Sequence, residues 1–293
     1  MKVGLQLPYF NWPGSPANIG AKLTEIGQHA DAAGFSSLWV MDHFFQIAVV
    51  GKPEEPMLES YSVLNFLAGV TSKPRLGTLV TGVVYRHPGI LVKTVTTLDV
   101  LSGGRAWLGI GAAWYEREAK GLGVTYPPTK ARFERLEETL QIAHQMWNDD
   151  SSPYNGTHYQ LAEPMNHRQP LSRPHPPIMI GGMGEQKTLR LVAQYADACN
   201  LFAGAGDDVI RSRLDVLKRH CATVGRNYDD IERTALATIH IAPGAMTVQD
   251  VISQCKSLAE LGMQHVIFNM PNVHDITPLE AFGREIIPEV AAL

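Results

Sequence analysis

The chain alternates short apolar runs with longer segments whose apolar residues recur at helical spacing. Residues 3–7 form the first apolar run, and residues 19–33 carry apolar side chains three or four positions apart before Gly34, a residue type that often ends a helix. Further strands are predicted at 38–41, 76–84, 106–110, 177–180, 198–202, 234–241 and 266–270. Further helices are predicted at 60–70, 90–101, 132–147, 185–195, 209–224, 248–261 and 279–290.

Eight strand–helix pairs in a chain of 293 residues predict an α/β protein of the (β/α)8 TIM-barrel type. Strands that are apolar on both faces suit a parallel sheet covered by helices. A doubly wound open sheet is the alternative, but no G-x-G-x-x-G motif follows the first strand. We therefore expect one barrel domain over residues 1–293.

One stretch breaks the alternation after the fourth strand–helix pair. Residues 149–176 contain five prolines and a glycine, which disfavour both helices and central strands. This stretch is predicted to be an irregular insertion, with a short strand at residues 158–161.

Composition excludes several classes of protein. Hydrophobic residues make up 45% of the chain and charged residues 18%, so the composition is that of a well-packed globular protein. The net charge is −4 and no basic run is present, which argues against nucleic acid or an anionic membrane as a partner. Gln6 and Pro8 interrupt the apolar start, so we expect no signal peptide, and no apolar run is long enough to span a membrane. Three cysteines without a metal or pairing pattern suit a reduced, cytoplasmic protein.

In a barrel the reactive residues follow the carboxyl ends of the strands, and several of these positions carry candidate catalytic or binding residues. Asp42 and His43 follow the second strand, and a histidine there can act as a general acid or base near neutral pH. Arg86 and His87 follow the third strand and can donate hydrogen bonds at the same rim. The structural alternatives are a buried histidine bonded to backbone, and an arginine paired with a nearby acid.

Small residues follow the fourth and fifth strands. Gly111, Ala112 and Ala113 would let a flat ligand lie against bare backbone, with Trp114 beside it. The run Gly181–Gly184, with Met183 inside it, precedes a predicted helix and would expose backbone N–H groups to an anion such as phosphate. The alternative is a glycine loop with a purely conformational role.

These features together favour a phosphorylated aromatic cofactor such as a flavin. The histidines are scattered along the chain, so no metal site is expected. No Ser/His/Asp or Cys/His arrangement stands out either.

Several segments, in order along the chain, resemble the luciferase-like monooxygenase superfamily, and most closely its coenzyme F420-dependent oxidoreductases of actinobacterial type. The matching segments are SLWVMDHF at 37–44, YRHPG at 85–89, LDVLSGGR at 98–105, LGIGAAWY at 108–115, RFERLEE at 132–138, IMIGG at 178–182 and YADA at 195–198. Each motif is weak alone, but their joint order over residues 1–270 is specific.

The resemblance implies a barrel that binds FMN or the deazaflavin coenzyme F420 at the strand ends, often in a homodimer. It implies that Asp42 and His43 face the cofactor ring, and that a cis peptide bond between Leu79 and Val80 supports the ring's back face, next to Thr81. Residues 111–113 would then flank the ring, and residues 181–183 would hold the phosphate. The substrate would lie near Trp39, Arg86, His87 and Trp114.

Two departures from the related F420-dependent glucose-6-phosphate dehydrogenases bear on the substrate. Those enzymes have a glutamate acid where this chain has Trp114, which points to a more apolar substrate than a sugar phosphate. They also have a lysine after the sixth strand, whereas residues 203–208 here contain none.

We therefore expect an oxidoreductase that transfers a hydride between F420 and a small organic substrate, with His43 as the proton donor or acceptor beside Asp42. The alternative enzyme is an FMN-dependent monooxygenase supplied by a separate reductase. A non-catalytic cofactor-binding protein is the alternative outside enzymes.

Overall fold

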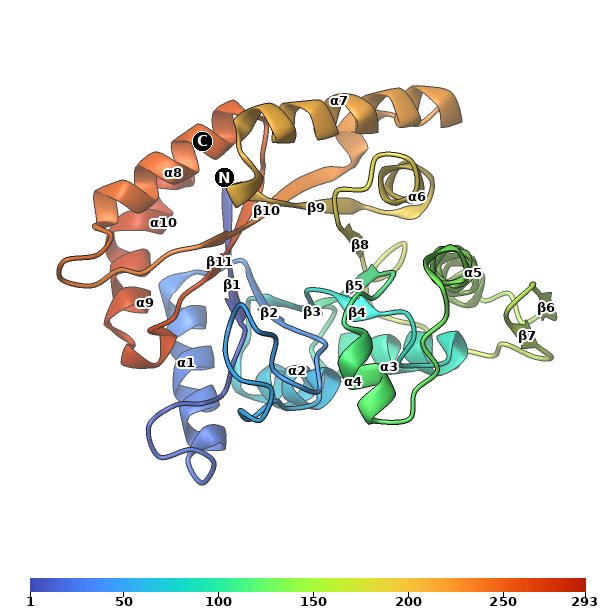
Figure 1. Cartoon of the computed structure of the whole chain (residues 1–293), viewed down its shortest axis with the longest axis horizontal. Helices are drawn as coiled ribbons and strands as arrows, with labels where there is room; N and C mark the ends of the chain where they lie inside the picture. Colours follow the sequence, from blue (N-terminus) through green and yellow to red (C-terminus); the bar gives the residue numbers. More distant parts are fainter.

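A computed structural model describes all residues, 1–293, and contains a closed barrel of parallel strands surrounded by helices (Figure 1). The strands of the barrel are β1 (Lys2–Leu7), β2 (Ser37–Val40), β3 (Arg75–Thr78) continued by β4 (Thr81–Gly82), β5 (Ala106–Gly111), β8 (Ile178–Gly181), β9 (Ala198–Phe202), β10 (Glu232–Thr238) and β11 (His265–Asn269). The barrel closes because β5 pairs with both β3 and β4 on one side and with β8 on the other. The predicted (β/α)8 TIM-barrel class is confirmed.

The helices form the outer layer, as their one-sided apolar patterns predict. They are α1 (Ile19–Ala33), α2 (Ser60–Val70), α3 (Pro88–Leu101), α4 (Glu116–Gly121), α5 (Thr129–Trp147), α6 (Thr188–Tyr195), α7 (Asp207–Val224), α8 (Val248–Glu260), α9 (Thr277–Ala281) and α10 (Ile287–Val290). The last predicted helix is divided by a π turn over Phe282–Ile286, just before Pro288, which has no N–H to continue the regular pattern.

The third strand differs from its prediction as one continuous run. It is interrupted between β3 and β4 at Leu79–Val80, and the peptide bond joining these two residues is cis, as the resemblance implied. Hydroxyl groups bridge the interruption, because Thr78 Oγ1 and Thr81 Oγ1 lie 2.6 Å apart. The interruption therefore has a fixed shape at the carboxyl end of the barrel.

The predicted irregular segment after α5 contains a small antiparallel hairpin, β6 (Tyr154–Asn155) and β7 (Gln160–Leu161), and otherwise no helix or strand between α5 and β8. The buried carboxylate of Glu138 on α5 accepts hydrogen bonds from the backbone N–H groups of Thr157, His158 and Tyr159. These bonds attach the hairpin turn to the helix.

The barrel interior is filled by a compact layer of side chains around two tryptophans. Trp39 and Trp107 meet edge to face at 5.7 Å between ring centroids, and Met179, Ala198 and Ile267 complete the layer. The expectation that Trp39 lies in the substrate pocket is corrected, since this ring is fully buried inside the barrel.

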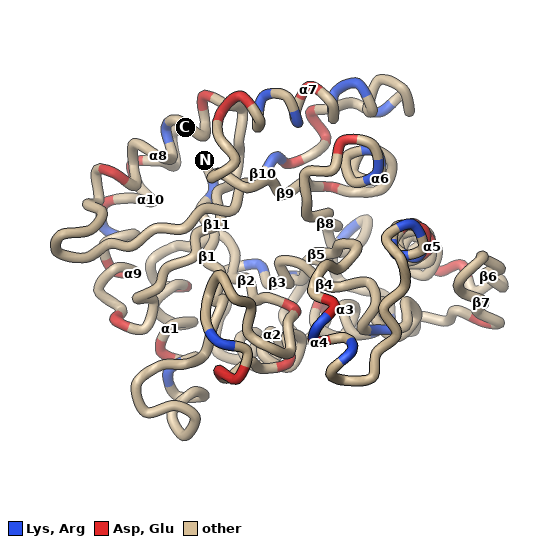
Figure 2. The backbone as a smooth tube through the Cα atoms, viewed as in Figure 1, with Lys and Arg blue, Asp and Glu red and all other residues tan.

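Charged residues lie mainly on the outer helices and loops, and the strands of the barrel carry few of them (Figure 2). All three cysteines are free and buried, and burial raises the pKa of the Cys199 thiol to about 12. No helix combines the length and apolar character that crossing a membrane requires. No group of three or more His, Cys, Asp or Glu residues is placed to hold a metal ion.

Candidate active site

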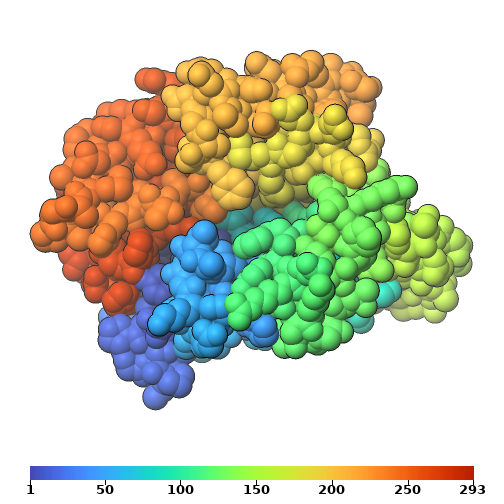
Figure 3. Space-filling model, in the orientation of Figure 1, coloured from blue at the N-terminus to red at the C-terminus, as the bar shows by residue number.

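A cavity of about 560 Å³ opens at the carboxyl ends of the barrel strands. It is lined by residues from the ends of all eight strands and from the loops that follow them, and over half of these residues are hydrophobic. The space-filling view shows the hollow between the light-blue segment near residue 50, the green segment near residue 115 and the yellow segment near residue 185 (Figure 3). This is the end of a barrel at which active sites lie.

One wall of the cavity is built from backbone with few side chains. A Cβ atom added to Gly111 or Gly181 would come within 3.0 Å of a methyl group of Val80, so neither position accepts a larger residue without movement. Ala113 has a φ of +60°, in the left-handed region that residues other than glycine rarely adopt. These residues leave a flat surface that we call the backbone ledge, defined as residues 111–113 and 181–182.

The cavity brings together nearly all residues that the sequence suggested for cofactor binding. The lining includes Asp42, His43, Leu79, Val80, Thr81, Gly111, Ala112, Ala113, Gly181 and Gly182. Met183 is the exception, because its side chain packs against the main hydrophobic core and does not line the cavity.

The residues suggested for the substrate side are separated by the fold. Trp114 lines the cavity and stacks on Tyr115, with ring centroids 5.2 Å apart. His87 precedes α3 and meets Tyr159 edge to face, outside the cavity. Arg86 also lies outside the lining, because its guanidinium turns towards Asp42.

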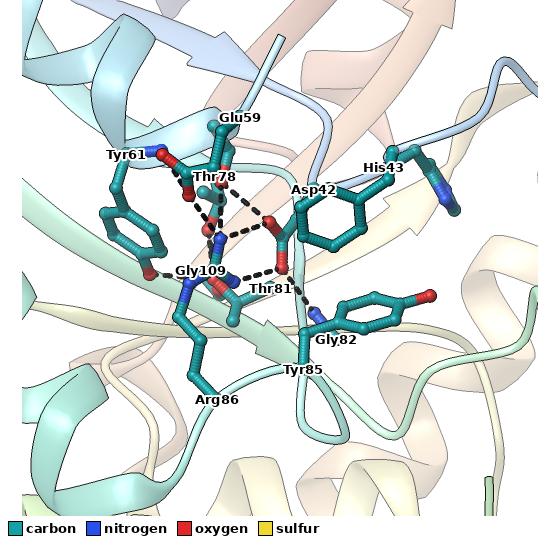
Figure 4. Close-up of polar contacts among 12 residues, drawn as sticks. Asp42, His43, Glu59, Tyr61, Thr78, Thr81, Gly82, Tyr85, Arg86 and Gly109 are labelled. Atoms are coloured by element: carbon teal, nitrogen blue, oxygen red, sulfur yellow. Dashed lines mark hydrogen bonds and ion pairs between the residues drawn. The ribbon is translucent and has the colours of Figure 1, made fainter. Parts of the chain in front are cut away.

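Asp42 and Arg86 form a bidentate ion pair at the ends of the second and third strands, in which the carboxylate is buried and the guanidinium is half-buried (Figure 4). The Arg86 nitrogens donate to the two Asp42 oxygens at 2.8 and 3.0 Å, and Ser60 Oγ and the backbone N–H of Gly82 donate to the same carboxylate. Asp42 therefore has no free oxygen for the neighbouring imidazole. Its carboxylate positions the turn after β4 instead.

Further groups surround the Arg86 guanidinium. Glu59 accepts a hydrogen bond from it, and the ring of Tyr61 lies 4.8 Å from its central carbon. Burial works against the charge of Arg86, but the Asp42 and Glu59 carboxylates outweigh burial and raise its pKa. Burial and the Asp42 charge also raise the pKa of Tyr61 to about 12, so its hydroxyl stays protonated beside Thr81.

The imidazole of His43 is held by Glu118, a residue that sequence reasoning missed. The Nδ1 atom of His43 lies 2.7 Å from Glu118 Oε1, and the other carboxylate oxygen accepts from the backbone N–H groups of Phe44 and Phe45. Glu118 lies on α4 and is fully buried. Because Nδ1 is engaged, Nε2 is the ring nitrogen left for the cavity that His43 lines.

Tyr85 is the second group that binds Glu118. Its hydroxyl donates to Oε1, and burial together with this hydrogen bond raises the pKa of the phenol. Burial opposes ionisation of Glu118, but the hydrogen bonds from His43 and Tyr85 outweigh it and hold the pKa of the carboxyl below its ordinary value. Glu118 is thus an anion that two donors from different loops share.

Three amide side chains line the cavity and were also missed: Gln6 and Asn200, which are buried, and Asn269, which is half-buried. Gln6 and Asn269 are neighbours across β1 and β11, and each has an amide oxygen without a partner in the chain. The amide nitrogen of Gln6 donates to the carbonyl of Leu79 at 3.3 Å, and Asn200 donates to Thr234. Unpaired buried acceptors are rare in proteins, so these oxygens are suited to a ligand that carries N–H donors.

The one arginine in the cavity lining is already engaged. Arg132 donates to the carbonyl oxygens of Ala112 and Pro127 at 3.0 and 2.7 Å, and its guanidinium lies over the ring of Tyr126 at 4.3 Å. It therefore supports the backbone ledge from below and is not a free cation.

Comparison with known families gives a match over almost the whole chain. The model of the family described as "Luciferase-like monooxygenase" matches residues 1–284. The chain belongs to the luciferase-like monooxygenase family.

Several relatives carry a named activity, and two of them are described here. A protein of Kineococcus radiotolerans, named F420-dependent glucose-6-phosphate dehydrogenase, is 30% identical over 219 residues. That match covers 73% of this chain and 62% of the relative, so it spans less than two thirds of the relative's length. A protein of the same name from Microbacterium testaceum is 25% identical over 332 residues, covering 96% of this chain and 97% of the relative.

Solved structures with the same fold include enzymes of different chemistry. The coenzyme F420-dependent tetrahydromethanopterin reductase of Methanopyrus kandleri has a TM-score of 0.81 at 17% identity, with 98% of each chain covered. The monooxygenase RslO1 of Streptomyces bottropensis has a TM-score of 0.82 at 16% identity, covering 98% of this chain and 99% of the other. At such identities the likeness shows the fold alone.

Proposed function

We propose that this protein is an oxidoreductase that transfers a hydride between coenzyme F420 and a small organic substrate in the cavity. The observation that carries the proposal is the position of His43, whose Nδ1 is fixed by Glu118 while the ring lines the same cavity as the backbone ledge. The names of the relatives from Kineococcus radiotolerans and Microbacterium testaceum support F420 as the coenzyme.

The residues of the cavity fit the deazaflavin of F420. The unpaired amide oxygens of Gln6 and Asn269 would accept hydrogen bonds from ring N–H groups, and the backbone ledge would accept a flat ring face. Gly182, with a φ of +119°, and Thr188 line the cavity at the start of α6, where N–H groups and a hydroxyl suit the phosphate. Lys187 lies beside them over the ring of Phe133, at 5.2 Å.

F420, when bound, would supply a carrier for one hydride, which is two electrons and one proton, on its deazaflavin ring. The residues of the chain itself would transfer the proton and hold the cavity wall in position. His43 holds or releases a proton at Nε2, while the Glu118 anion keeps the proton on Nδ1 and stabilises the positively charged ring. Asp42 and Arg86 hold the turn that carries Thr81 and Gly82 into the cavity wall.

A reduced-FMN monooxygenase is the second candidate, because the family as a whole carries that description and the backbone ledge accepts either ring. It would require a separate reductase and would consume oxygen. We also propose that the protein acts as a cytoplasmic homodimer, as the resemblance implies, and light scattering on the purified protein tests the dimer.

The deciding experiment is to titrate the purified protein into F420 and into FMN while the absorbance and fluorescence of each are recorded. F420 is expected to be perturbed at micromolar protein, and reduced FMN is expected to cause no oxygen uptake above that of free flavin. Oxygen uptake coupled to substrate conversion with FMN would replace the proposal by the second candidate. Binding of F420 with no turnover on any substrate would favour a non-catalytic cofactor-binding protein.

His43→Ala tests the assigned proton transfer. Turnover is expected to fall by about 10²- to 10⁴-fold, the usual contribution of a general acid or base, with little change in the Kd for F420. His87→Ala is the matched control, because this histidine lies outside the cavity against Tyr159. Unchanged turnover in His43→Ala would remove the residue from the reaction.

A further inference from the structure

A second cavity lies at the opposite end of the barrel from the candidate active site. It has a volume of about 390 Å³ and lies at the amino ends of the strands, because its lining includes the first residues of β1, β3 and β10. We call it the basal cavity; the lining residues that matter here are Arg75, Trp107, Arg173, Asp229 and Asp230. It shares no lining residue with the candidate active site. The amino end of a TIM barrel ordinarily serves stability, so charged groups left without partners there need an explanation.

Two guanidinium groups line the basal cavity without a carboxylate partner. The Arg75 side chain forms no hydrogen bond or ion pair, and its central guanidinium carbon lies 6.0 Å from the centre of the Trp107 ring. Arg173 donates through Nη1 to the backbone carbonyls of Pro170 and Ser172, which leaves its Nη2 group without a partner. Guanidinium groups match the geometry of carboxylates, so this side of the cavity suits a carboxylate.

A buried donor belongs to the same side of the basal cavity. Trp107 lies on β5, between β3, which begins with Arg75, and β8, which follows Arg173. Trp107 is 5% exposed, and its Nε1–H has no hydrogen-bond partner within the chain. Buried polar groups are nearly always hydrogen-bonded in native proteins, so this N–H indicates an acceptor that the chain does not supply. A carboxylate in the cavity would supply one.

Unpaired carboxylates lie on the other side of the basal cavity. Asp229 and Asp230 directly precede β10, which stands across the barrel from β3 with three strands between them in either direction. Both are exposed, and their side-chain contacts are long, at 3.6 Å between Asp229 and Arg233 and 3.3 Å between Asp230 and Asn227. These two carboxylates are therefore available to a cationic group.

The balance of charge decides which ligand suits the basal cavity. Its lining carries three lysine or arginine residues and four aspartate or glutamate residues, and one pair among them, Lys2 with Glu232, is already formed. A simple anion would lie near unpaired carboxylates and a simple cation near unpaired guanidinium groups, and like charges placed together are unfavourable. A ligand with one charge of each sign, held apart, meets a complementary group at both ends.

From these observations we propose that the basal cavity binds a small zwitterion, a molecule with a carboxylate at one end and an ammonium group at the other. Arg75 and Arg173 bind the carboxylate, with the Trp107 N–H as a further donor. Asp229 and Asp230 bind the ammonium group. This site is separate from the hydride-transfer cavity, and the proposal does not depend on the proposed function.

The test uses unbranched ω-amino acids that differ in the distance between their two charges: glycine, 4-aminobutanoate and 6-aminohexanoate. In isothermal titration calorimetry at neutral pH we expect one chain length to bind best, because the charge separation has to match the cavity. The carboxylic acid and the amine of that same length each lack one charge and are expected to bind at least about tenfold more weakly. Equal binding of the acid or the amine, or no heat from any amino acid up to about 10 mM, would overturn the proposal.

Two sets of variants test the location of the ligand. Arg75→Gln, and the double variant Asp229→Asn with Asp230→Asn, are each expected to weaken binding of the preferred amino acid about tenfold. All three residues are exposed, so the variants are expected to keep the melting temperature of the native chain. Arg211→Gln is the matched control, because Arg211 is an exposed arginine on α7 outside the basal cavity. Native affinity in Arg75→Gln would place the ligand elsewhere and contradict the proposal.

A competition measurement separates the basal cavity from the candidate active site. The affinity for the preferred amino acid is expected to be the same with and without F420, because the two cavities lie at opposite ends of the barrel. Displacement of the amino acid by F420 would place it in the active-site cavity and contradict the proposal. Failure of F420 to bind contradicts the proposed function and leaves the variant test of the basal cavity decisive.

Discussion

Glu118 Oε1 lies 2.7 Å from Nδ1 of His43, although the two residues are 75 positions apart and Asp42 is the immediate neighbour of the histidine. The carboxylate next to His43 in sequence is instead occupied by Arg86. The group that orients the imidazole thus comes from α4, the helix that follows the fourth strand of the barrel.

Replacing Glu118 by glutamine tests this arrangement. The amide keeps the shape of the side chain but removes the negative charge that stabilises a protonated His43, so turnover is expected to fall by about one to two orders of magnitude. The Kd for F420 is expected to stay unchanged, because the variant removes a charge that acts on His43 and not a group of the cavity lining. Glu116→Gln, on the exposed side of the same helix, is the control. A loss of activity accompanied by an equal loss of F420 affinity would mean that Glu118 has only a structural role.

The Asp42–Arg86 pair is expected to dominate local stability. Arg86→Ala leaves a buried carboxylate without its partner and should lower the free energy of unfolding by about 3–5 kcal/mol in urea denaturation. Adding Asp42→Asn to this variant should recover part of the loss, because it removes the unpaired charge. Lys256→Ala breaks the exposed pair with Glu289 and should cost no more than about 1 kcal/mol. Equal effects of Arg86→Ala and Lys256→Ala would contradict this assignment.

The pH dependence of stability can be tested at Glu232, which is remote from the cavity mouth. Burial opposes its ionisation, but hydrogen bonding to His265 and the charges of His265 and Lys2 outweigh burial and lower the pKa of Glu232. A carboxylate whose pKa is lower in the folded state stabilises the fold above its ordinary value of 4.5, and this contribution is lost as the pH falls through the folded value.

We therefore expect the difference in unfolding free energy between the native chain and Glu232→Gln to be largest near neutral pH. It should shrink as the pH falls below about 4.5, in denaturation curves measured from pH 7 to pH 3. The exposed Glu163→Gln is the control and should show no such trend. A difference that grows towards acid would reverse the assigned sign.

Gly109 in β5 is expected to tolerate no side chain. A Cβ at this position would overlap the backbone carbonyl oxygen of Thr78, which cannot move without displacing the strand interruption beside the cavity. Gly109→Ala should destabilise the protein by roughly 3 kcal/mol, the upper end for overpacking, or prevent folding. Gly20→Ala in α1 meets no atom within 4 Å and should change stability by less than about 1 kcal/mol, in the stabilising direction. Similar melting temperatures for the two variants would contradict the expectation.

The fold was predictable because its signal repeats. Each strand is apolar on both faces and each helix is apolar on one face. A wrong prediction for a single element, such as the division of the last helix before Pro288, therefore does not change the number of predicted strand–helix pairs. The interruption at Leu79–Val80 could be predicted only from the resemblance to the luciferase-like family. A cis peptide bond between two aliphatic residues does not change the pattern of apolar residues along the chain.

The parts of the site that are formed by the backbone could be predicted from the sequence. The parts that are formed by side chains from different loops were harder to predict. Small residues after a strand are visible in sequence, which is why Gly111 and Gly181 were found. Glu118 was missed because an acidic residue on a short helix resembles any solvent-facing charge until its burial is known. Gln6 and Asn269 did leave a signal, since an amide inside an apolar strand must find a partner or a ligand.

The loops after β2 and β5 supply Val49 and Trp114 to the cavity lining, whereas the backbone ledge and the interruption at Leu79–Val80 lie at the ends of the strands or directly after them. This separation means that the two halves of the site can change independently over evolutionary time. Exchanging residues 47–50 and Trp114 for those of another family member should transfer substrate preference without loss of coenzyme affinity. One scaffold can thereby diversify its substrates by loop replacement alone.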